Sequence, residues 1–417
     1  MIRRSSMKNM VCLADGCTMP TNQSETGINE NRLIVGTTRC GKTFSIVEPM
    51  LLHTYEGSLV VNITKRALFD KYAPIFEARG YEVLDLNFAE PEKSKISYDP
   101  LNYLKKDRDF INIGRAICEV INNDSDPFWM ESAANCTTAM LKLVDLNSKS
   151  ENKAPSFSDF KLLFSNIEFD YSKMSSTNLN VFFDEAERLY PNNLAWQKWK
   201  TIRTAAPKTT ASISSILNAT LNDFFDNDLL NMMSKDYKLS FENLASKKTV
   251  LFVTTSPFNR SSEKLVNLFY NDLFRNLFDF AERCPNKELP IPVNIICDDF
   301  AVGSKIPNFA EDISIFCAKR IAVTMLLQSE SQLEGMYSKA EAQTIINNCD
   351  TYVYMGGMDD MTCHSISRRI NKPVEDIFYM PLEQVIVMRR GSKPVISKRY
   401  QTLEDPLYKK LCMKAGA

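Results

Sequence analysis

Three residue types are scarce in this chain of 417 residues, which holds 13 Gly, 2 His and 3 Trp. The 11 cysteines are scattered and form no Cys-x-x-Cys pair, and the two histidines, His53 and His364, complete no zinc-ligating set. The spacing therefore argues against structural zinc. Free thiols in this number suit a reducing compartment better than a secreted disulfide framework.

The chain also has a net charge of only -1 and lacks a long apolar run. Lys and Arg number 50 against 51 Asp and Glu, so any contact with DNA has to use local basic patches. No apolar stretch reaches the length that crosses a bilayer. The basic start, Met1-Ile2-Arg3-Arg4, precedes an apolar stretch that is too short for a signal peptide. We therefore expect a cytoplasmic chain without a transmembrane segment.

Short apolar runs alternate with helical patterns, which predicts an α/β fold with a mostly parallel sheet. A stretch with few glycines and a helical pattern interrupts the alternation, and we expect it to form an inserted all-alpha domain whose core includes Phe128, Trp129, Trp196 and Trp199. The expected domains are an N-terminal segment at 1–30, a nucleotide-binding domain in two parts at 31–106 and 236–417, and the all-alpha domain at 107–235. Strands are expected at 32–35, 59–63, 81–86, 249–254, 293–297, 321–327, 351–355 and 385–388.

The clearest motif follows the first of these strands. Residues 36–43 match G-x-x-x-x-G-K-T, and a helical pattern follows them, which is the context that a phosphate-binding loop (P-loop) requires. Glycines let backbone N–H groups approach phosphate oxygens, Lys42 would reach the β- and γ-phosphates of ATP, and the Thr43 hydroxyl would bind Mg²⁺. The loop reads Gly36-Thr37-Thr38-Arg39-Cys40-Gly41-Lys42-Thr43.

A P-loop ATPase also needs acidic residues at the end of a second strand, and two places compete for this role. Asp184 and Glu185 end the run Val181-Phe182-Phe183, but a helical pattern surrounds them, so we expect them to be surface charges. Asp298 and Asp299 end the predicted strand 293–297 instead. We therefore choose Asp298 as the carboxylate on the Mg²⁺ side and Asp299 as the one that orients the attacking water.

With these motifs in place, the chain resembles the coupling proteins of conjugative and type IV secretion systems, the TraG/TraD-like ATPases. The resemblance runs from about Asn31 to Tyr408. Besides the P-loop, it rests on Glu48-Pro49, Gly80-Tyr81-Glu82-Val83, Ser97-Tyr98-Asp99-Pro100-Leu101-Asn102, Asp126-Pro127-Phe128-Trp129, Asp298-Asp299-Phe300-Ala301, Ile306-Pro307-Asn308-Phe309, Leu327-Gln328-Ser329, Gln332-Leu333 and Gly356-Gly357-Met358-Asp359.

The resemblance implies a RecA-like P-loop NTPase domain that carries the all-alpha insertion. It implies a hexameric ring that uses ATP and Mg²⁺ to bring relaxase-bound DNA to a type IV secretion channel. Gln328, which lies 29 residues after Asp299 (328 − 299), matches the family's glutamine and would sense the γ-phosphate or hold the attacking water. Arg320, beside Lys319, is our candidate for the arginine that acts in trans on a neighbouring subunit's nucleotide.

Four features depart from the family pattern. Asp299 stands where members usually have Glu, and only Lys65 of the usual Asp-Pro-Lys-Gly-Glu is kept in Asn62-Ile63-Thr64-Lys65-Arg66-Ala67. Arg39 and Cys40 replace small loop residues, and Arg39 either contacts phosphate or faces solvent. The membrane helices of the family are not found. We therefore expect a soluble variant or one that docks on a separate membrane anchor, peripheral at the inner face of the cell membrane.

Two other functions stay open at this point. Asp299 and the altered Asn62 segment allow a nucleotide-binding adaptor that recruits relaxase or another substrate without efficient hydrolysis. A ring translocase of chromosome segregation or virion packaging is the third possibility, and the helical insertion with Asp126-Pro127-Phe128-Trp129 argues against it.

Overall fold

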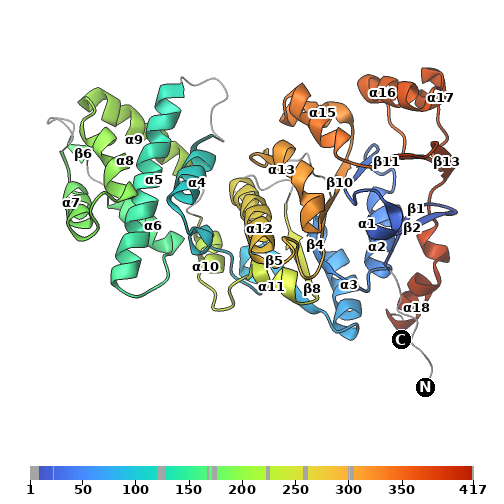
Figure 1. Cartoon of the computed structure of the whole chain (residues 1–417), viewed down its shortest axis with the longest axis horizontal. Coiled ribbons are helices and arrows are strands. Elements are labelled where there is room, and N and C mark those ends of the chain that lie inside the picture. Colours follow the sequence, from blue (N-terminus) through green and yellow to red (C-terminus); the bar gives the residue numbers. More distant parts are fainter. Residues whose placement is uncertain are drawn as a thin grey trace. The chain divides into compact units, whose positions relative to one another are not determined.

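The computed structural model of the chain describes residues 9–21, 23–119, 127–166, 169–170, 176–221, 226–256, 262–298, 300 and 305–415. The chain divides into two compact units (Figure 1). We call residues 1–85, 240–254 and 277–417 the sheet unit, and residues 86–239 and 255–276 the helical unit.

The sheet unit is built on a mostly parallel sheet of nine strands in the order β13-β12-β11-β3-β10-β9-β4-β8-β5. Strand β3 is parallel to both of its neighbours, β11 and β10, while β12 and β13 join the sheet in antiparallel pairs. The strands are β3 (Arg32–Val35), β4 (Ser58–Ile63), β5 (Glu82–Asn87), β8 (Thr249–Thr254), β9 (Val293–Cys297), β10 (Ile321–Leu327), β11 (Thr351–Tyr354), β12 (Gln384–Arg389) and β13 (Val395–Lys398).

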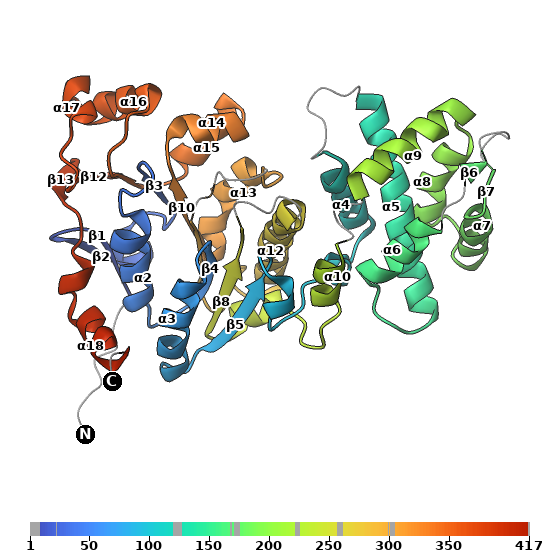
Figure 2. The ribbon, with the colours of Figure 1, turned by 180° about the vertical axis from the view of Figure 1, so that it is seen from behind.

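The apolar runs fit this sheet because both of its faces are covered. Every residue of β3, β8, β9, β10 and β11 is buried, as expected where helices cover the two faces of parallel strands. Ile34, Ile296, Leu326 and Val353 share one core cluster with α3 (Arg66–Ala78) and with the helix after the P-loop, η1 (Thr43–Val47) and α2 (Glu48–Leu52), which we call the P-loop helix. Figure 2 shows α2 and α3 beside the strands. The predicted α/β fold with a mostly parallel sheet is confirmed.

The remaining helical elements of the sheet unit are mostly short. They are α1 (Gln23–Thr26), the π-helical turn η1 (Thr43–Val47), α2 (Glu48–Leu52), α3 (Arg66–Ala78), α11 (Phe241–Ser246), α13 (Phe309–Phe316), η6 (Cys317–Lys319), α14 (Glu330–Met336), α15 (Lys339–Asn347), α16 (Asp360–Ile370), α17 (Val374–Phe378), η7 (Thr402–Glu404) and α18 (Pro406–Ala415). Helix α12 (Glu263–Arg283) has residues in both units.

The N-terminal segment is more ordered than its weak sequence pattern indicates. Strands β1 (Met10–Ala14) and β2 (Cys17–Pro20) form an antiparallel hairpin, and β1 lies against η1 and α2. Val11 and Leu13 are buried in the same core cluster as Ile34. The described part of the segment therefore belongs to the sheet unit.

The helical unit packs around one long helix, α5 (Pro127–Ser150), which lies against helices that precede and follow it in the chain. Trp199 is fully buried and stacks on Phe183 at 4.3 Å between ring centroids. Phe128, which we expected in the core, is 57% exposed. The other elements are η2 (Pro91–Lys93), η3 (Pro100–Tyr103), α4 (Asp107–Glu119), α6 (Phe157–Ser165), α7 (Asn180–Leu189), α8 (Leu194–Arg203), α9 (Pro207–Leu221), α10 (Asn227–Met233) and the small strand pair β6 (Phe169–Asp170) and β7 (Ser176–Thr177).

The division into units differs from the expected boundaries at 107 and 235. Residues 86–106 and 255–276 belong to the helical unit. The rings of Phe88, Tyr98 and Phe269 contact one another there, and the Tyr98 hydroxyl donates to Asp272 at 2.8 Å. These contacts join segments that are far apart in the chain, so no local pattern marks the boundary. The expected domain limits stay a prediction.

Across the described residues, the structure contains no helix that combines the length and the apolar character needed to span a membrane.

Candidate functional site

The loop of residues 36–43 begins where β3 ends, between two parallel neighbours. Val35 is paired with Leu327 of β10 on one side and with Tyr354 of β11 on the other. The Gly36 amide donates to the Leu327 carbonyl at 3.1 Å, and the Met355 amide donates to the Val35 carbonyl at 2.7 Å. Both flanking strands therefore fix the start of the loop at the carboxyl edge of the sheet.

The two glycines of the loop are needed for different reasons. A methyl group on Gly36 would lie 2.7 Å from the Cys40 sulfur and 2.9 Å from the Met355 Cβ, which leaves no room for a side chain. Gly41 has a φ of +85°, in the left-handed region that favours glycine. Arg39 also has a positive φ, of 65°, and its side chain is exposed. The close packing at Gly36 and the positive φ at Gly41 thus explain why the motif has glycine at these two positions.

Lys42 and Thr43 follow Gly41 directly, and their side chains are held in place. The Lys42 ammonium donates to the carbonyl oxygens of Gly36 at 2.6 Å and Thr37 at 3.2 Å, so its charge lies within the loop. The Thr43 hydroxyl donates to a carboxylate oxygen of Asp298 at 2.7 Å. Asp298 comes directly after β9, is 9% exposed and lies 255 residues further along the chain.

The sheet order explains how these residues meet. Strand β10 lies between β3 and β9 and is parallel to both, so the carboxyl ends of the three strands share one edge. Gln328 follows β10 at that edge, next to Leu327, whose carbonyl accepts from Gly36. Gln328 is exposed, and its backbone N–H donates to the side-chain oxygen of Gln332 at 3.0 Å. Asp299 lies outside the described residues.

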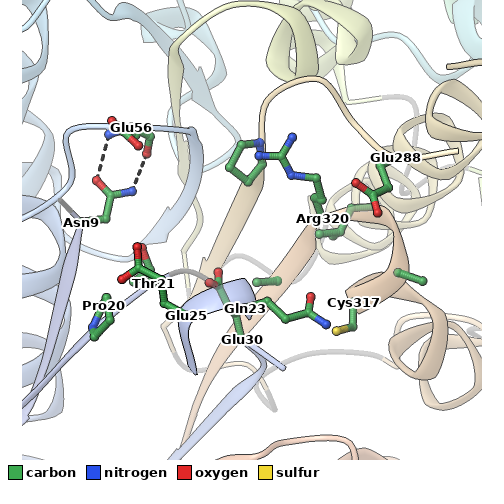
Figure 3. Close-up of a pocket in the computed structure, with 14 residues that line it drawn as sticks. Asn9, Pro20, Thr21, Gln23, Glu25, Glu30, Glu56, Glu288, Cys317 and Arg320 are labelled. Carbon is green, nitrogen blue, oxygen red and sulfur yellow. Dashed lines mark hydrogen bonds between the residues drawn. The ribbon is translucent and has the colours of Figure 1, made fainter. Parts of the chain in front are cut away.

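The structure places Arg320 at the opposite edge. It precedes β10, which has seven residues, so roughly 20 Å of strand separates it from the P-loop of its own chain. Its guanidinium donates to the carbonyl oxygens of Leu289 and Pro290, both at 3.0 Å. It also lines a cavity of about 810 Å³ at the amino ends of the strands, together with Glu30, Glu288 and Cys317 (Figure 3). Arg320 therefore lies out of reach of the P-loop of its own chain.

The rejected acidic pair belongs to the helical unit and not to the sheet unit that carries the P-loop. Asp184 and Glu185 are on α7 in the helical unit, where both are exposed. Asp184 pairs with Arg203 at 2.7 Å and Glu185 pairs with Arg188 at 2.6 Å. They are surface charges, as expected.

The sequence reasoning missed the C-terminal segment that covers the P-loop helix. The Thr402 hydroxyl donates to the Phe44 carbonyl at 2.6 Å, and the Tyr408 ring meets the Phe44 ring edge-on at 5.9 Å. A methyl group on Gly41 would lie 3.7 Å from an Arg399 nitrogen. No local signal links these residues, because 358 positions separate Phe44 from Thr402.

The arrangement has the donor set that a nucleotide with Mg²⁺ requires. A loop that begins at a glycine with no room for a side chain, a lysine whose ammonium lies within it, and a threonine hydroxyl facing an acid at the end of another strand are the parts of a P-loop site. Carboxylate and hydroxyl oxygens are ligands that Mg²⁺ accepts. The strand order and this site together define a RecA-like P-loop NTPase.

The sequence profile described as "Type IV secretory system Conjugative DNA transfer" matches residues 20–375. The chain therefore belongs to this family of type IV secretion proteins. It is 24% identical over 352 residues to Protein VirD4 of Rhizobium radiobacter, covering 83% of this chain and 48% of that protein. It is 23% identical over 350 residues to Protein VirD4 of Agrobacterium fabrum, covering 82% of this chain and 50% of that protein. The chain thus spans about half the length of these curated relatives.

Solved structures share the fold. The plasmid coupling protein TrwB in complex with ADP and Mg²⁺ matches with a TM-score of 0.63 and 14% identity, over 97% of this chain and 92% of TrwB. VirB4 of Thermoanaerobacter pseudethanolicus matches with a TM-score of 0.57 and 11% identity, over 96% of this chain and 97% of VirB4. The predicted RecA-like fold and the predicted family are confirmed.

Proposed function

We propose that this chain is a coupling-protein ATPase that recruits relaxase-bound DNA and drives it into a conjugative type IV secretion channel. The observation that carries the proposal is the hydrogen bond of 2.7 Å between Thr43 and Asp298. It joins the P-loop to an acidic strand end at the edge where Gln328 also lies. Membership of the conjugative DNA transfer family supports the DNA substrate.

Each site residue has a role in this proposal. The loop amides and Lys42 would bind the phosphates of ATP, with Lys42 reaching the β- and γ-phosphates, and Thr43 and Asp298 would hold Mg²⁺. The metal, when bound, neutralises charge on the phosphates. Asp299 would orient the attacking water, and Gln328 would sense the γ-phosphate from the end of β10. Arg320 would complete the site of the neighbouring copy in a homo-hexamer.

The test is ATP turnover with and without added DNA. We expect turnover that rises with DNA and is lost in Lys42→Ala, because the loop then lacks its fixed cation. Lys393→Ala is the matched control, since Lys393 is exposed in the turn between β12 and β13 and should leave turnover unchanged. Turnover that does not respond to DNA would contradict a DNA-driven motor.

The alternative is a nucleotide-binding adaptor that recruits relaxase or another substrate without efficient hydrolysis. Asp299 motivates it, because its carboxylate is one methylene shorter than that of the Glu usual in the family. The adaptor predicts ATP binding without turnover in the wild type. Turnover that appears in Asp299→Glu would show that the site needs only the longer side chain.

The location follows from the same proposal. A chain that delivers DNA to a secretion channel works at the inner face of the cell membrane, and we propose that a separate membrane protein anchors it there together with the channel components. Co-purification of the chain with the membrane fraction only when the channel proteins are co-expressed would support this placement. Equal membrane binding without them would contradict it.

A further inference from the structure

Arg399 lies beside the phosphate-binding loop, although no sequence motif marks it. It follows β13 directly, and its Nη1 atom lies 3.7 Å from the position that a methyl group on Gly41 would take. Gly41 is the loop residue immediately before Lys42. The guanidinium is thus next to the end of the loop, where backbone N–H groups of a P-loop cradle the α- and β-phosphates.

The hydrogen-bonding capacity of this guanidinium is largely unused among the described residues. Nη2 donates to the Met355 carbonyl at 3.5 Å, which is a long hydrogen bond. Nε is buried and has no hydrogen-bond partner in the part of the chain that the structure describes. A buried donor without an acceptor costs free energy, so an acceptor supplied by a ligand would stabilise this arrangement.

The backbone around Arg399 is held firmly against the rest of the sheet unit. The Arg399 amide donates to the Glu383 carbonyl at 2.7 Å, and the next residue, Tyr400, donates through its hydroxyl to Asp405 at 2.7 Å. Two residues further on, Thr402 bonds to the Phe44 carbonyl in the helix that leaves the loop. The backbone that carries the guanidinium is therefore positioned relative to the loop before any ligand arrives, which lowers the entropic cost of binding.

We propose that Arg399 binds the α- and β-phosphates of the nucleotide within its own chain. The inference rests on the proposed function, since it requires that the loop takes ATP. The Lys42 ammonium donates to the carbonyl oxygens of Gly36 and Thr37, while the Arg399 guanidinium lies beside Gly41. The two cations thus divide the triphosphate between them, with Lys42 at the β- and γ-phosphates. The planar guanidinium suits this role because it can donate two hydrogen bonds to phosphate oxygens at once.

This division gives Arg399 a signature that a γ-phosphate sensor lacks. ADP carries both phosphates that Arg399 would contact. The affinities for ADP and for a non-hydrolysable ATP analogue should therefore depend equally on Arg399. Lysine keeps the positive charge but lacks the paired N–H donors of the planar guanidinium. The nucleotide affinity of Arg399→Lys should therefore fall between that of the wild type and that of Arg399→Gln. Lys398→Gln is the matched control, because it removes a neighbouring positive charge whose side chain is exposed.

The experiment measures dissociation constants for MgADP and for a non-hydrolysable MgATP analogue by titration calorimetry. We expect Arg399→Gln to weaken both by roughly tenfold or more, as for a lost hydrogen bond to a charged group, while Lys398→Gln binds like the wild type. Unchanged ADP affinity in Arg399→Gln would overturn the proposal, and so would a loss confined to the triphosphate. Should Arg399→Gln fail to fold, as judged by its thermal melt without nucleotide, Arg399→Lys decides, because wild-type affinity in that variant also overturns it.

The same titration separates this inference from the proposed function. Binding by the wild type that is lost in Lys42→Ala keeps the nucleotide site, whatever Arg399→Gln shows. A wild type that binds neither nucleotide overturns both the site and the role of Arg399.

Discussion

Thr43 donates a hydrogen bond of 2.7 Å to Asp298, although 255 residues separate them in the chain. The two residues belong to different strand-to-helix connections, one after β3 and one after β9. Strand β10, between them, brings both connections to one edge of the sheet. The relationship is the structural basis for treating the two connections as one site.

The first prediction concerns that hydroxyl. Thr43→Ala removes the group that would ligate Mg²⁺, whereas Thr43→Ser keeps it. Loss of metal-assisted charge stabilisation worth several kcal/mol should lower ATP turnover by roughly 100-fold in Thr43→Ala. Thr43→Ser should stay within about threefold of the wild type at saturating Mg²⁺. Turnover measured over a range of Mg²⁺ concentrations checks this, and equal rates for the two variants would contradict the metal role.

Local sequence signals were sufficient to predict the parts of this site that lie on the sheet. The strand before Asp298 and the one before Gln328 are each a short, largely apolar run followed by a polar residue, and the strand before Gly36 is an apolar run followed by glycine. Such runs are typical of parallel strands that are buried on both faces, and the polar residue marks the carboxyl end. The bounds of β9 and β10 agree with the prediction residue for residue.

The parts that could not be predicted depend on long-range contacts. Strand β13 is exposed or half-exposed along its length, so it has no apolar pattern to find. The contact of Thr402 with Phe44 joins residues that no spacing rule connects. The N-terminal hairpin is short, and the burial of Val11 depends on the core cluster that it enters. In each case tertiary packing, and no local preference, decides the conformation.

A second prediction tests the close approach at Gly36. Gly36→Ala places a methyl group 2.9 Å from the Met355 Cβ, which cannot move without shifting the backbone of the next strand. Overpacking of this kind costs about 1–3 kcal/mol in the free energy of unfolding, and displacement of the loop should abolish nucleotide binding. Urea unfolding and nucleotide titration measure the two effects.

Gly335→Ala is the control for that substitution. Gly335 is exposed on α14, and nothing lies within 4 Å of the added methyl group. Because alanine favours helix over glycine by up to about 1 kcal/mol, this variant should be as stable as the wild type or more so and should bind nucleotide normally. A Gly36→Ala protein that behaves like Gly335→Ala would contradict the packing argument.

A third prediction addresses Arg320. Its position at the amino edge of the sheet means that it can act only on a neighbouring copy, if the copies form a ring. Arg320→Ala and Lys42→Ala should each lose turnover alone. When the two proteins are mixed, an intact P-loop in an Arg320→Ala subunit can meet an intact Arg320 from a Lys42→Ala subunit, so part of the turnover should return. If native mass spectrometry shows mixed rings and the mixtures stay inactive, the proposed role of Arg320 in the neighbouring nucleotide site is contradicted.

A fourth prediction concerns pH and the start of α15, where Ser338 and Glu341 form a capping box. The Glu341 carboxylate pairs with Lys305 and accepts from the Ser338 amide at 2.8 Å, and these contacts lower the pKa of Glu341 to about 2. A carboxyl whose pKa is lowered by folding stabilises the fold above its unfolded pKa, about 4.3. That contribution is lost as the pH falls from about 4.3 towards the folded pKa of about 2.

Glu341→Gln should therefore destabilise the protein by about 1 kcal/mol at pH 7, since Lys305 is partly exposed and solvent screens the pair. The difference from the wild type should shrink steadily below pH 4.3. Glu334→Gln, on the neighbouring helix α14, is the control, because the Glu334 carboxylate bonds to none of the described residues. Urea unfolding of the three proteins between pH 7 and pH 3 makes the comparison. A penalty for Glu341→Gln that stays constant over this range would show that the charge of Glu341 contributes nothing to the cap, and that only its shape does.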